Sequence, residues 1–168
     1  MIDFLPPEGV TLRRARPGDF AFAEALYLSS TRPLLTALGA WDEEGARTRL
    51  RAAFDRHPPL VIRADGEDVG WVQVSVRPGA IHLHQIHLDD AWRNRGIGSR
   101  LIGDIMRAAR KAKLPVTLNV IHGNPAVELY KRLDFVIVNT GRELLQMRWQ
   151  EDGPDAAAAT EPPPASQT

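Results

Sequence analysis

The chain of 168 residues contains no cysteine. Disulfide bonds, thiolate metal sites and covalent catalysis through a cysteine thiol are therefore excluded. No apolar stretch approaches the roughly 18–20 residues that a membrane-spanning helix requires. The first residues also lack the pattern of a secretory signal, because Asp3, Pro6 and Pro7 interrupt the apolar run. We therefore expect a cytoplasmic protein with no membrane partner.

An excess of charge of one sign is also missing. The 21 Lys and Arg residues balance 21 Asp and Glu residues. Four of the acidic residues, and none of the basic ones, lie in residues 151–168, so residues 1–150 carry a basic excess of four. That excess suits an anionic small-molecule ligand. It is far too small to indicate nucleic-acid binding, and no basic run is interleaved with aromatic residues.

Large apolar residues are absent from the last part of the chain. Ala156–Ala159 and Pro162–Pro164 dominate this segment, which cannot bury enough surface to offset the entropy of ordering. We predict one domain over residues 1–150, followed by a disordered acidic, Pro- and Ala-rich tail over residues 151–168. The hydrophobic composition of 43% is sufficient for a single core.

Residues 1–150 alternate strand-like and helix-like patterns. Short or alternating apolar runs predict strands at Val10–Arg14, Leu60–Ala64, Val69–Val76, Ile81–Leu88, Val116–Val120, Val136–Asn139 and Glu143–Trp149. Apolar stripes with helical spacing predict helices over residues 20–29, 42–54 and 97–112, and a further helix whose first residue is Pro125. The order β-α-α-β-β-β-α-β-α-β-β predicts an α/β fold (mixed α+β), with helices flanking a mixed central sheet of about six or seven strands.

Two features set the expected helix bounds in the first third of the chain. Arg32-Pro33 is expected to end the first helix, because proline has no backbone N–H and its ring clashes with the preceding turn. Residues 34–38 would then form a separate short helical turn. Asp42 is expected to be the N-cap of the second helix, with acidic residues in the first turn.

The most informative segment is the glycine loop Arg93–Arg100, which follows the predicted strand Ile81–Leu88 and opens a long amphipathic helix. Such a loop leaves backbone N–H groups unpaired at the positive end of the helix dipole. Arg93, Arg95 and Arg100 could add charge-assisted hydrogen bonds to an anion bound there. We therefore predict a site for a phosphate-bearing ligand, and specifically for a diphosphate.

The glycine spacing discriminates between known diphosphate loops. A dinucleotide fingerprint would need glycine or alanine where Leu101 stands, and the chain has no Lys-Ser or Lys-Thr pair for a Walker loop. What remains is R-x-x-G-x-G over Arg93–Gly98. A second motif, N-x-A-x-x-x-Y…L-D-F, follows about thirty residues later over Asn124–Phe135.

In this order and at this separation, the two motifs resemble the acetyl-CoA loop, [QR]-x-x-G-x-[GA], and the N-x-A-x-x-x-Y…L-G-F segment of the GNAT superfamily of N-acetyltransferases. The resemblance covers roughly Val10 to Trp149. It implies the GNAT fold and an enzyme that moves an acetyl group from acetyl-CoA directly to a primary amine. A CoA-binding sensor or interaction module of the same fold is the alternative. Asp134 replaces the motif's glycine, so we expect it to adopt a positive φ.

The resemblance also implies roles for individual residues. The cofactor site would comprise Leu88, Arg93, Asn94, Arg95, Gly96, Ile97, Gly98, Ser99, Arg100, Asn124 and Tyr130. The backbone N–H of Leu88 would bond the thioester carbonyl, and Tyr130 would protonate the departing sulfur. A phenol with a pKa of about 10 can do this only when it is positioned and desolvated. The alternative is that Tyr130 is a core aromatic residue of an amphipathic helix.

The acceptor must lose a proton before it attacks, since an alkylammonium has a pKa of about 10.4. His82 and His84 share one face of their strand, and no Asp or Glu lies between Asp68 and Asp89. Superfamily members with a His-x-His run at a similar place pass the proton through water, which makes His82 and His84 the candidate catalytic relay. Solvent acting as the base is the alternative.

The acceptor itself, a small-molecule or peptide amine, is not identified by the sequence. Trp41 and Glu43 fall where the superfamily covers the acceptor site, although a helix cap with a solvated first turn is the favoured explanation for them. His87 has the opposite parity to His82 and His84 unless its strand contains a bulge, and in place of a role in the relay it would line the acceptor site. No metal site is expected. The strand predicted at Glu143–Trp149 could supply a homodimer interface.

Overall fold

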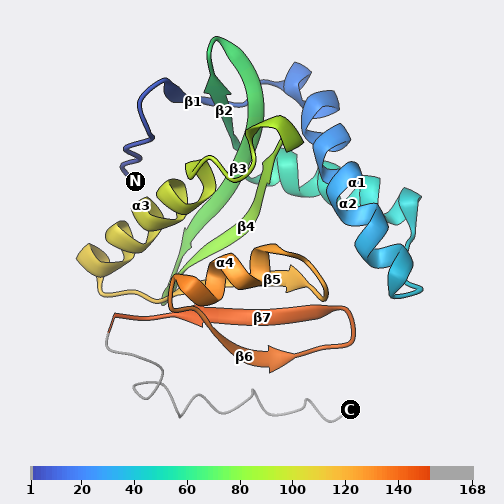
Figure 1. Ribbon diagram of the computed structural model, residues 1–168. Coiled ribbons are helices and arrows are strands. Elements are labelled where there is room, and N and C mark those ends of the chain that lie inside the picture. Colours follow the sequence, from blue (N-terminus) through green and yellow to red (C-terminus); the bar gives the residue numbers. More distant parts are fainter. Residues whose placement is uncertain (1, 152–168) are drawn as a thin grey trace.

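The computed structural model describes residues 2–151, so nearly all of the predicted tail lies outside the described residues. Within them, seven strands form one sheet: β1 (Val10–Arg14), β2 (Leu60–Ala64), β3 (Glu67–Arg77), β4 (Ala80–Leu88), β5 (Val116–Ile121), β6 (Val136–Thr140) and β7 (Leu144–Trp149). The helices are α1 (Phe20–Ala37), α2 (Glu43–Arg56), α3 (Ile97–Ala112) and α4 (Ala126–Arg132). The predicted order of helices and strands is confirmed (Figure 1). None of these helices is both long and apolar enough to cross a membrane.

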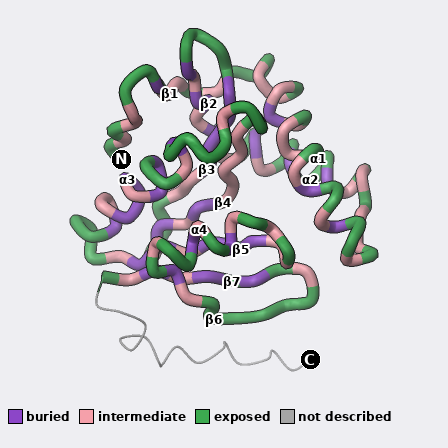
Figure 2. Tube along the Cα trace, viewed as in Figure 1, coloured by how far each residue is buried: buried purple, intermediate pink, exposed green. Residues whose placement is uncertain are grey.

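The sheet has the order β1-β2-β3-β4-β5-β7-β6, with every neighbouring pair antiparallel except β4 and β5. Helices α1 and α2 cover one face, and α3 and α4 cover the other (Figure 1). The larger core lies on the α3 and α4 face, where Ile97, Leu101 and Ile105 are buried as their spacing predicts. A smaller core around Trp71 and Phe54 lies under α1 and α2. Figure 2 shows how buried and exposed positions alternate along the helices.

The predicted break at Pro33 is wrong, because α1 continues through it to Ala37. Pro33 lies on the exposed face of α1, and its missing N–H leaves one helical hydrogen bond unformed. In the turn before it, the Thr31 hydroxyl donates to the Tyr27 carbonyl oxygen at 2.7 Å. Burial of Thr31 and Leu35 on either side of Pro33 holds the helix against the sheet. Tertiary packing therefore outweighs the local signal.

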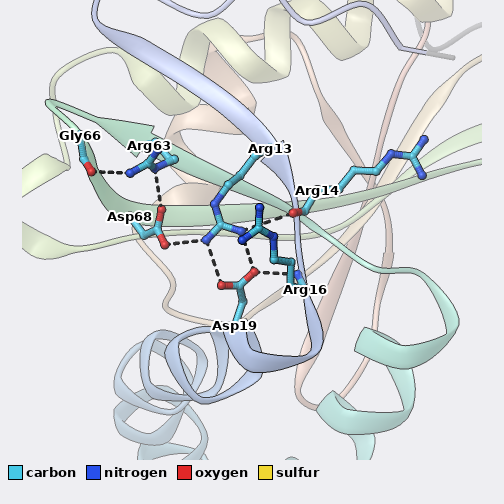
Figure 3. Close-up of polar contacts among 7 residues, drawn as sticks. All are labelled: Arg13, Arg14, Arg16, Asp19, Arg63, Gly66 and Asp68. Carbon is cyan, nitrogen blue, oxygen red and sulfur yellow. Dashed lines mark hydrogen bonds and ion pairs between the residues drawn. The ribbon is translucent and has the colours of Figure 1, made fainter.

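An arginine–carboxylate network fixes the entry to α1 (Figure 3). The guanidinium of Arg13 on β1 bonds Asp19, immediately before α1, at 2.7 Å and Asp68 on β3 at 2.6 Å. Arg63 on β2 bonds Asp68 at 2.9 Å. The hydrogen bonds from Arg13 lower the pKa of Asp19 to about 2, so this carboxylate stays ionised at neutral pH. The network thus anchors the start of α1 to three strands.

The parallel pairing of β4 with β5 is short. It joins Ile81–Leu83 to Val116–Leu118 only, although β4 continues to Leu88 and β5 to Ile121. The two strands therefore separate beyond Leu83, and we refer to this divergence as the split. On its other edge β4 pairs with β3 along its whole length, with a register shift that makes His84 an extra residue.

Candidate active site at the split in the sheet

Backbone groups of β4 face the split. In the pairing of β3 with β4, the Asp89 N–H donates to the Val69 carbonyl at 2.8 Å, and Trp71 lies opposite His87. Because hydrogen-bonded residues alternate along an antiparallel strand, the N–H groups of Ile86 and Leu88 point away from β3 and toward the split. There they have no ladder partner within the described residues. Leu88 is predicted from the sequence, whereas Ile86 is not. The only sequence signal for Ile86 is that it lies two residues before Leu88, so its N–H points the same way along the strand.

The glycine loop forms the predicted helix start. Asn94 has φ 59° and Gly96 has φ 80°, a left-handed conformation that glycine adopts without strain, and α3 begins at the next residue. The first hydrogen bond of the helix runs from the Arg100 N–H to the Gly96 carbonyl at 3.0 Å. The N–H groups of Ile97, Gly98 and Ser99 therefore lack helical partners, and no side chain caps them. This is the geometry of an anion site.

Three arginines surround the loop, each held by one or two contacts. Arg93 pairs with Asp90 at 2.8 Å and donates from Nε to the Leu88 carbonyl oxygen at 3.1 Å. The guanidinium of Arg95 stacks over the Trp92 ring at 4.6 Å. Arg100 donates from Nε to the Leu5 carbonyl oxygen at 2.9 Å. A guanidinium has five N–H donors, so each arginine retains donors for a ligand.

Helix α4 reaches the same region. A Cβ atom placed on Gly98 would lie 4.0 Å from both Ile86 of β4 and Leu129 of α4, so the first turn of α3, the split and α4 converge there. The Asn124 side chain accepts from the Ala126 N–H at 2.9 Å, and α4 starts one residue later than predicted. Asp134 has φ 64°, which confirms the expected left-handed turn.

Tyr130, on α4, is almost fully buried, with an exposed fraction of 6%. Its ring packs against Phe135 with centroids 5.7 Å apart. Burial raises the pKa of Tyr130 to about 12, so the phenol stays protonated throughout the physiological range. A group in this state can donate a proton but cannot accept one. The burial also satisfies the requirement for a desolvated phenol.

The predicted histidine pair lies on the opposite face of the sheet, under α1 and α2. The rings of His82 and His84 meet edge to face with centroids 4.6 Å apart, which confirms that they share a face. His82 Nδ1 lies 2.8 Å from Thr117 Oγ1, and His84 Nε2 lies 2.8 Å from Ser75 Oγ. Burial is the main cause that lowers the pKa of His82, and it lowers that of His84 to about 4. Both rings are therefore neutral at pH 7.

A third histidine, His57, joins this pair and was not predicted. It lies directly after α2, and its ring stacks on that of His84 with centroids 5.4 Å apart. The buried Gln73 side chain donates to the His57 carbonyl oxygen at 2.6 Å and so ties the end of α2 to β3. No motif marks His57, because only the packing of α2 on the sheet brings it to β4. His57, His82 and His84 are hereafter the histidine cluster.

The bulge at His84 also turns His87 toward α1, as the conditional prediction required. The His87 ring lies between Trp71 and Tyr27, with centroids 4.8 Å and 5.8 Å away. Its Nε2 lies 2.8 Å from Gln85 Oε1, and its Nδ1 lies 3.2 Å from the hydroxyl of Ser30. Burial lowers the pKa of His87 to about 4. A neutral His87 thus links α1 to the strand that borders the split.

Trp41 and Glu43 lie at the start of α2. The Glu43 carboxylate bonds Arg32 at 2.8 Å and Arg47 at 3.0 Å, and the Arg32 guanidinium also lies over the Trp41 ring. Asp42 accepts from the Gly45 N–H at 3.0 Å, which confirms it as the N-cap. The carboxylate expected to face an amine is therefore paired with two arginines. A role for Trp41 and Glu43 in acceptor binding stays a prediction.

A helix start that can bind a diphosphate, beside a split sheet with a buried phenol on one face and neutral histidines on the other, has the form of an acetyltransferase site. The acetyltransferase (GNAT) family matches residues 23–135, and the chain belongs to this family. Family members use acetyl-CoA as the co-substrate.

Known relatives agree with this assignment. Over 92 residues the chain is 32% identical to the L-amino acid N-acetyltransferase AaaT of Escherichia coli K12, a match that spans 50% of this chain and only 56% of the relative. The fold is similar to that of the PaiA N-acetyltransferase from Thermoplasma acidophilum in complex with coenzyme A (TM-score 0.66, 15% identity, 84% and 98% of the two chains). It is also similar to that of a GNAT family acetyltransferase from Elizabethkingia anophelis with acetyl-CoA bound (TM-score 0.62, 11% identity, 86% and 99%).

Proposed function

We propose that this protein transfers the acetyl group of acetyl-CoA directly to a primary amine. The observation that carries the proposal is the split, which has the anion-binding loop and Tyr130 on one face of the sheet and the histidine cluster on the other. A thioester lying in the split would separate a donor side from an acceptor side. Because the chain has no cysteine, it cannot form an acetyl-cysteine intermediate during the transfer.

The donor side would bind CoA through its charged and amide groups. The N–H groups of Ile97, Gly98 and Ser99 would bond the pyrophosphate, and the nearby arginines would neutralise its charge. The N–H groups of Ile86 and Leu88 would bond the amide chain and the thioester carbonyl, as a neighbouring strand would. A hydrogen bond to that carbonyl stabilises the negative charge that develops on its oxygen during attack.

In the transfer itself, the amine nitrogen would form a bond to the carbonyl carbon while the carbon–sulfur bond breaks. Tyr130 would give its proton to the departing sulfur. The proton lost by the amine would leave on the other face through His84 and water. Since burial lowers the pKa of His84 to about 4, the ring would act as a relay to solvent and not as a strong base.

The histidine relay predicts a particular pH dependence. We expect His82→Gln/His84→Gln to lower kcat/KM by about 10²-fold near pH 7, at the lower end for general acid–base catalysis because the lowered pKa makes the rings weak bases. The deficit should shrink as the pH approaches about 10, where the amine is already neutral without help. Because His84 stays neutral above a pKa of about 4, the wild-type profile should show no inflection near pH 6.5. Parallel profiles of variant and wild type would leave solvent as the base.

The reaction class is tested by incubating the full chain with acetyl-CoA and a panel of primary amines. We expect release of free CoA thiol together with an acetylated acceptor detected by mass spectrometry. L-Amino acids belong in the panel because one relative is named as an L-amino acid N-acetyltransferase. Polyamines, aminoglycosides and peptides with free N-termini complete it. Binding of CoA without turnover on any member would contradict the proposal.

A further inference from the structure

The histidine cluster has a cationic neighbour that the proposed mechanism does not use. Arg77, at the end of β3, folds back so that its guanidinium lies at the cluster. Nε is 3.3 Å from the Ser75 hydroxyl, and Nη2 is 3.4 Å from His84 Nε2. Thr117 contributes a second hydroxyl beside His82. Four side chains that can donate hydrogen bonds therefore lie next to His84: Arg77, Ser75, His57 and His82.

Negative charge is missing from this part of the site. No Asp or Glu occurs from Val69 to Leu88, and Arg77 forms no ion pair within the described residues. By contrast, Arg13, Arg63 and Arg93 each have a carboxylate partner. Burial is the main cause that lowers the pKa of His84, the neighbouring His82, Arg77 and His57 act in the same direction, and no carboxylate acts against them. Arg77 is exposed, has hydroxyl and imidazole neighbours and has no counterion within the described residues, so its guanidinium is available to bind an anion from solution.

The position of this cation relates it to the acceptor. His84 is the first β4 residue beyond the pairing with β5, so a group bound between Arg77 and His84 lies at the narrow end of the split. In an α-amino acid, two bonds connect the amine nitrogen to the carboxylate carbon. A carboxylate held by Arg77 would therefore keep its own amine close to His84.

We propose that Arg77 binds the carboxylate of the acceptor, and that the acceptor is an amino acid and not a simple amine. This inference rests on the proposed function and specifies its substrate class. Arg77 is then the specificity-determining residue, with Ser75 and Thr117 orienting the histidine rings. A bound carboxylate would also raise the pKa of His84, which would make that ring a better proton acceptor once the correct substrate is present.

The test compares acceptors that differ only in the carboxylate, such as phenylalanine with phenethylamine. The wild-type enzyme should give a higher kcat/KM with the acid. In Arg77→Gln, we expect the acid-to-amine ratio of kcat/KM to fall about tenfold to a hundredfold, mainly through a higher KM for the acid, because one charge-assisted contact is lost. Arg77→Lys should recover part of the ratio. Arg132→Gln is the matched control, since it removes an exposed arginine of α4 from the opposite face and should keep the ratio.

Three outcomes separate the explanations. Equal wild-type use of acid and amine, or an Arg77→Gln loss of the same size for both, would overturn the carboxylate site while leaving acetyl transfer intact. Failure of every acceptor to release CoA thiol would overturn the proposed function. In that case a binding measurement tests the carboxylate site separately. Phenylalanine titrated into the CoA-loaded wild-type protein should shift the His84 NMR signals, whereas phenethylamine should not. The absence of a shift would overturn the site as well.

Discussion

Replacing Tyr130 with Phe is expected to lower kcat by about 10²–10⁴-fold, the usual loss when a general acid is removed. The dissociation constant for CoA should change by no more than a few-fold. The reason is that the hydroxyl would act on sulfur only as the carbon–sulfur bond breaks, so its contribution appears in the transition state and not in the ground state. Steady-state kinetics at saturating acceptor, with CoA binding measured by calorimetry, separate the two effects.

The structure indicates that Tyr130→Phe removes the hydroxyl without disturbing the fold. The Tyr130 ring packs in the core against Phe135, and burial alone, with no hydrogen bond, accounts for its raised pKa. Phe fills the same ring position, so the variant should melt within a few degrees of the wild type. Wild-type turnover in a folded Tyr130→Phe variant would return this residue to the role of a core aromatic.

The second large effect concerns the glycine loop. CoA at a hundredfold excess over Kd should stabilise the wild-type protein by about 2.7 kcal/mol, which corresponds to a rise in Tm of roughly 5–10 °C for a domain of this size. Gly96→Glu/Gly98→Glu is expected to abolish that rise. Each glutamate would place a carboxylate among the N–H groups that the pyrophosphate needs, and Gly96 also has φ 80°. A thermal melt with and without CoA measures the effect.

Gly79 offers a matched control for the strain in this variant. It has φ 82° and, like Gly96, nothing within 4 Å of a Cβ atom placed on it, but it lies in the turn between β3 and β4. Gly79→Glu should therefore lower Tm and keep the response to CoA. Gly98→Ala should also keep the response, because its Cβ would meet only ordinary contacts at 4.0 Å. A full CoA response in the folded double variant would place the cofactor elsewhere.

The sequence was sufficient for those features that depend on local pattern. The order of helices and strands, the glycine loop before α3 and the Asp42 cap all follow from spacing over a few residues. Pro33 shows where local reasoning fails, since the burial of residues on both sides carries α1 through a residue that usually ends a helix. Local propensity alone could not include that packing energy.

The site was predictable to a similar degree. His82 and His84 share a face because strands alternate, whereas the position of His87 depends on a bulge that only the partner strand reveals. His57 follows α2, which is distant from β4 in the sequence, and its sequence neighbours carry no signal of the contact with His84. The point at which β4 and β5 separate could not be predicted from either strand, because it depends on how far two distant segments run side by side.

The short ladder between β4 and β5 has a mechanical consequence. Along the backbone, β1–β4 and β5–β7 are two half-sheets hinged on three residue pairs, and the continuity between them comes mainly from side chains packed against α3. Side-chain contacts tolerate small rotations that a hydrogen-bonded ladder resists. Amide protons near the hinge should therefore exchange through local opening that leaves each half-sheet folded. A ligand that contacts both β4 and β5 would add contacts across the split. The sheet should therefore be stiffer while the ligand is bound and more mobile after it leaves.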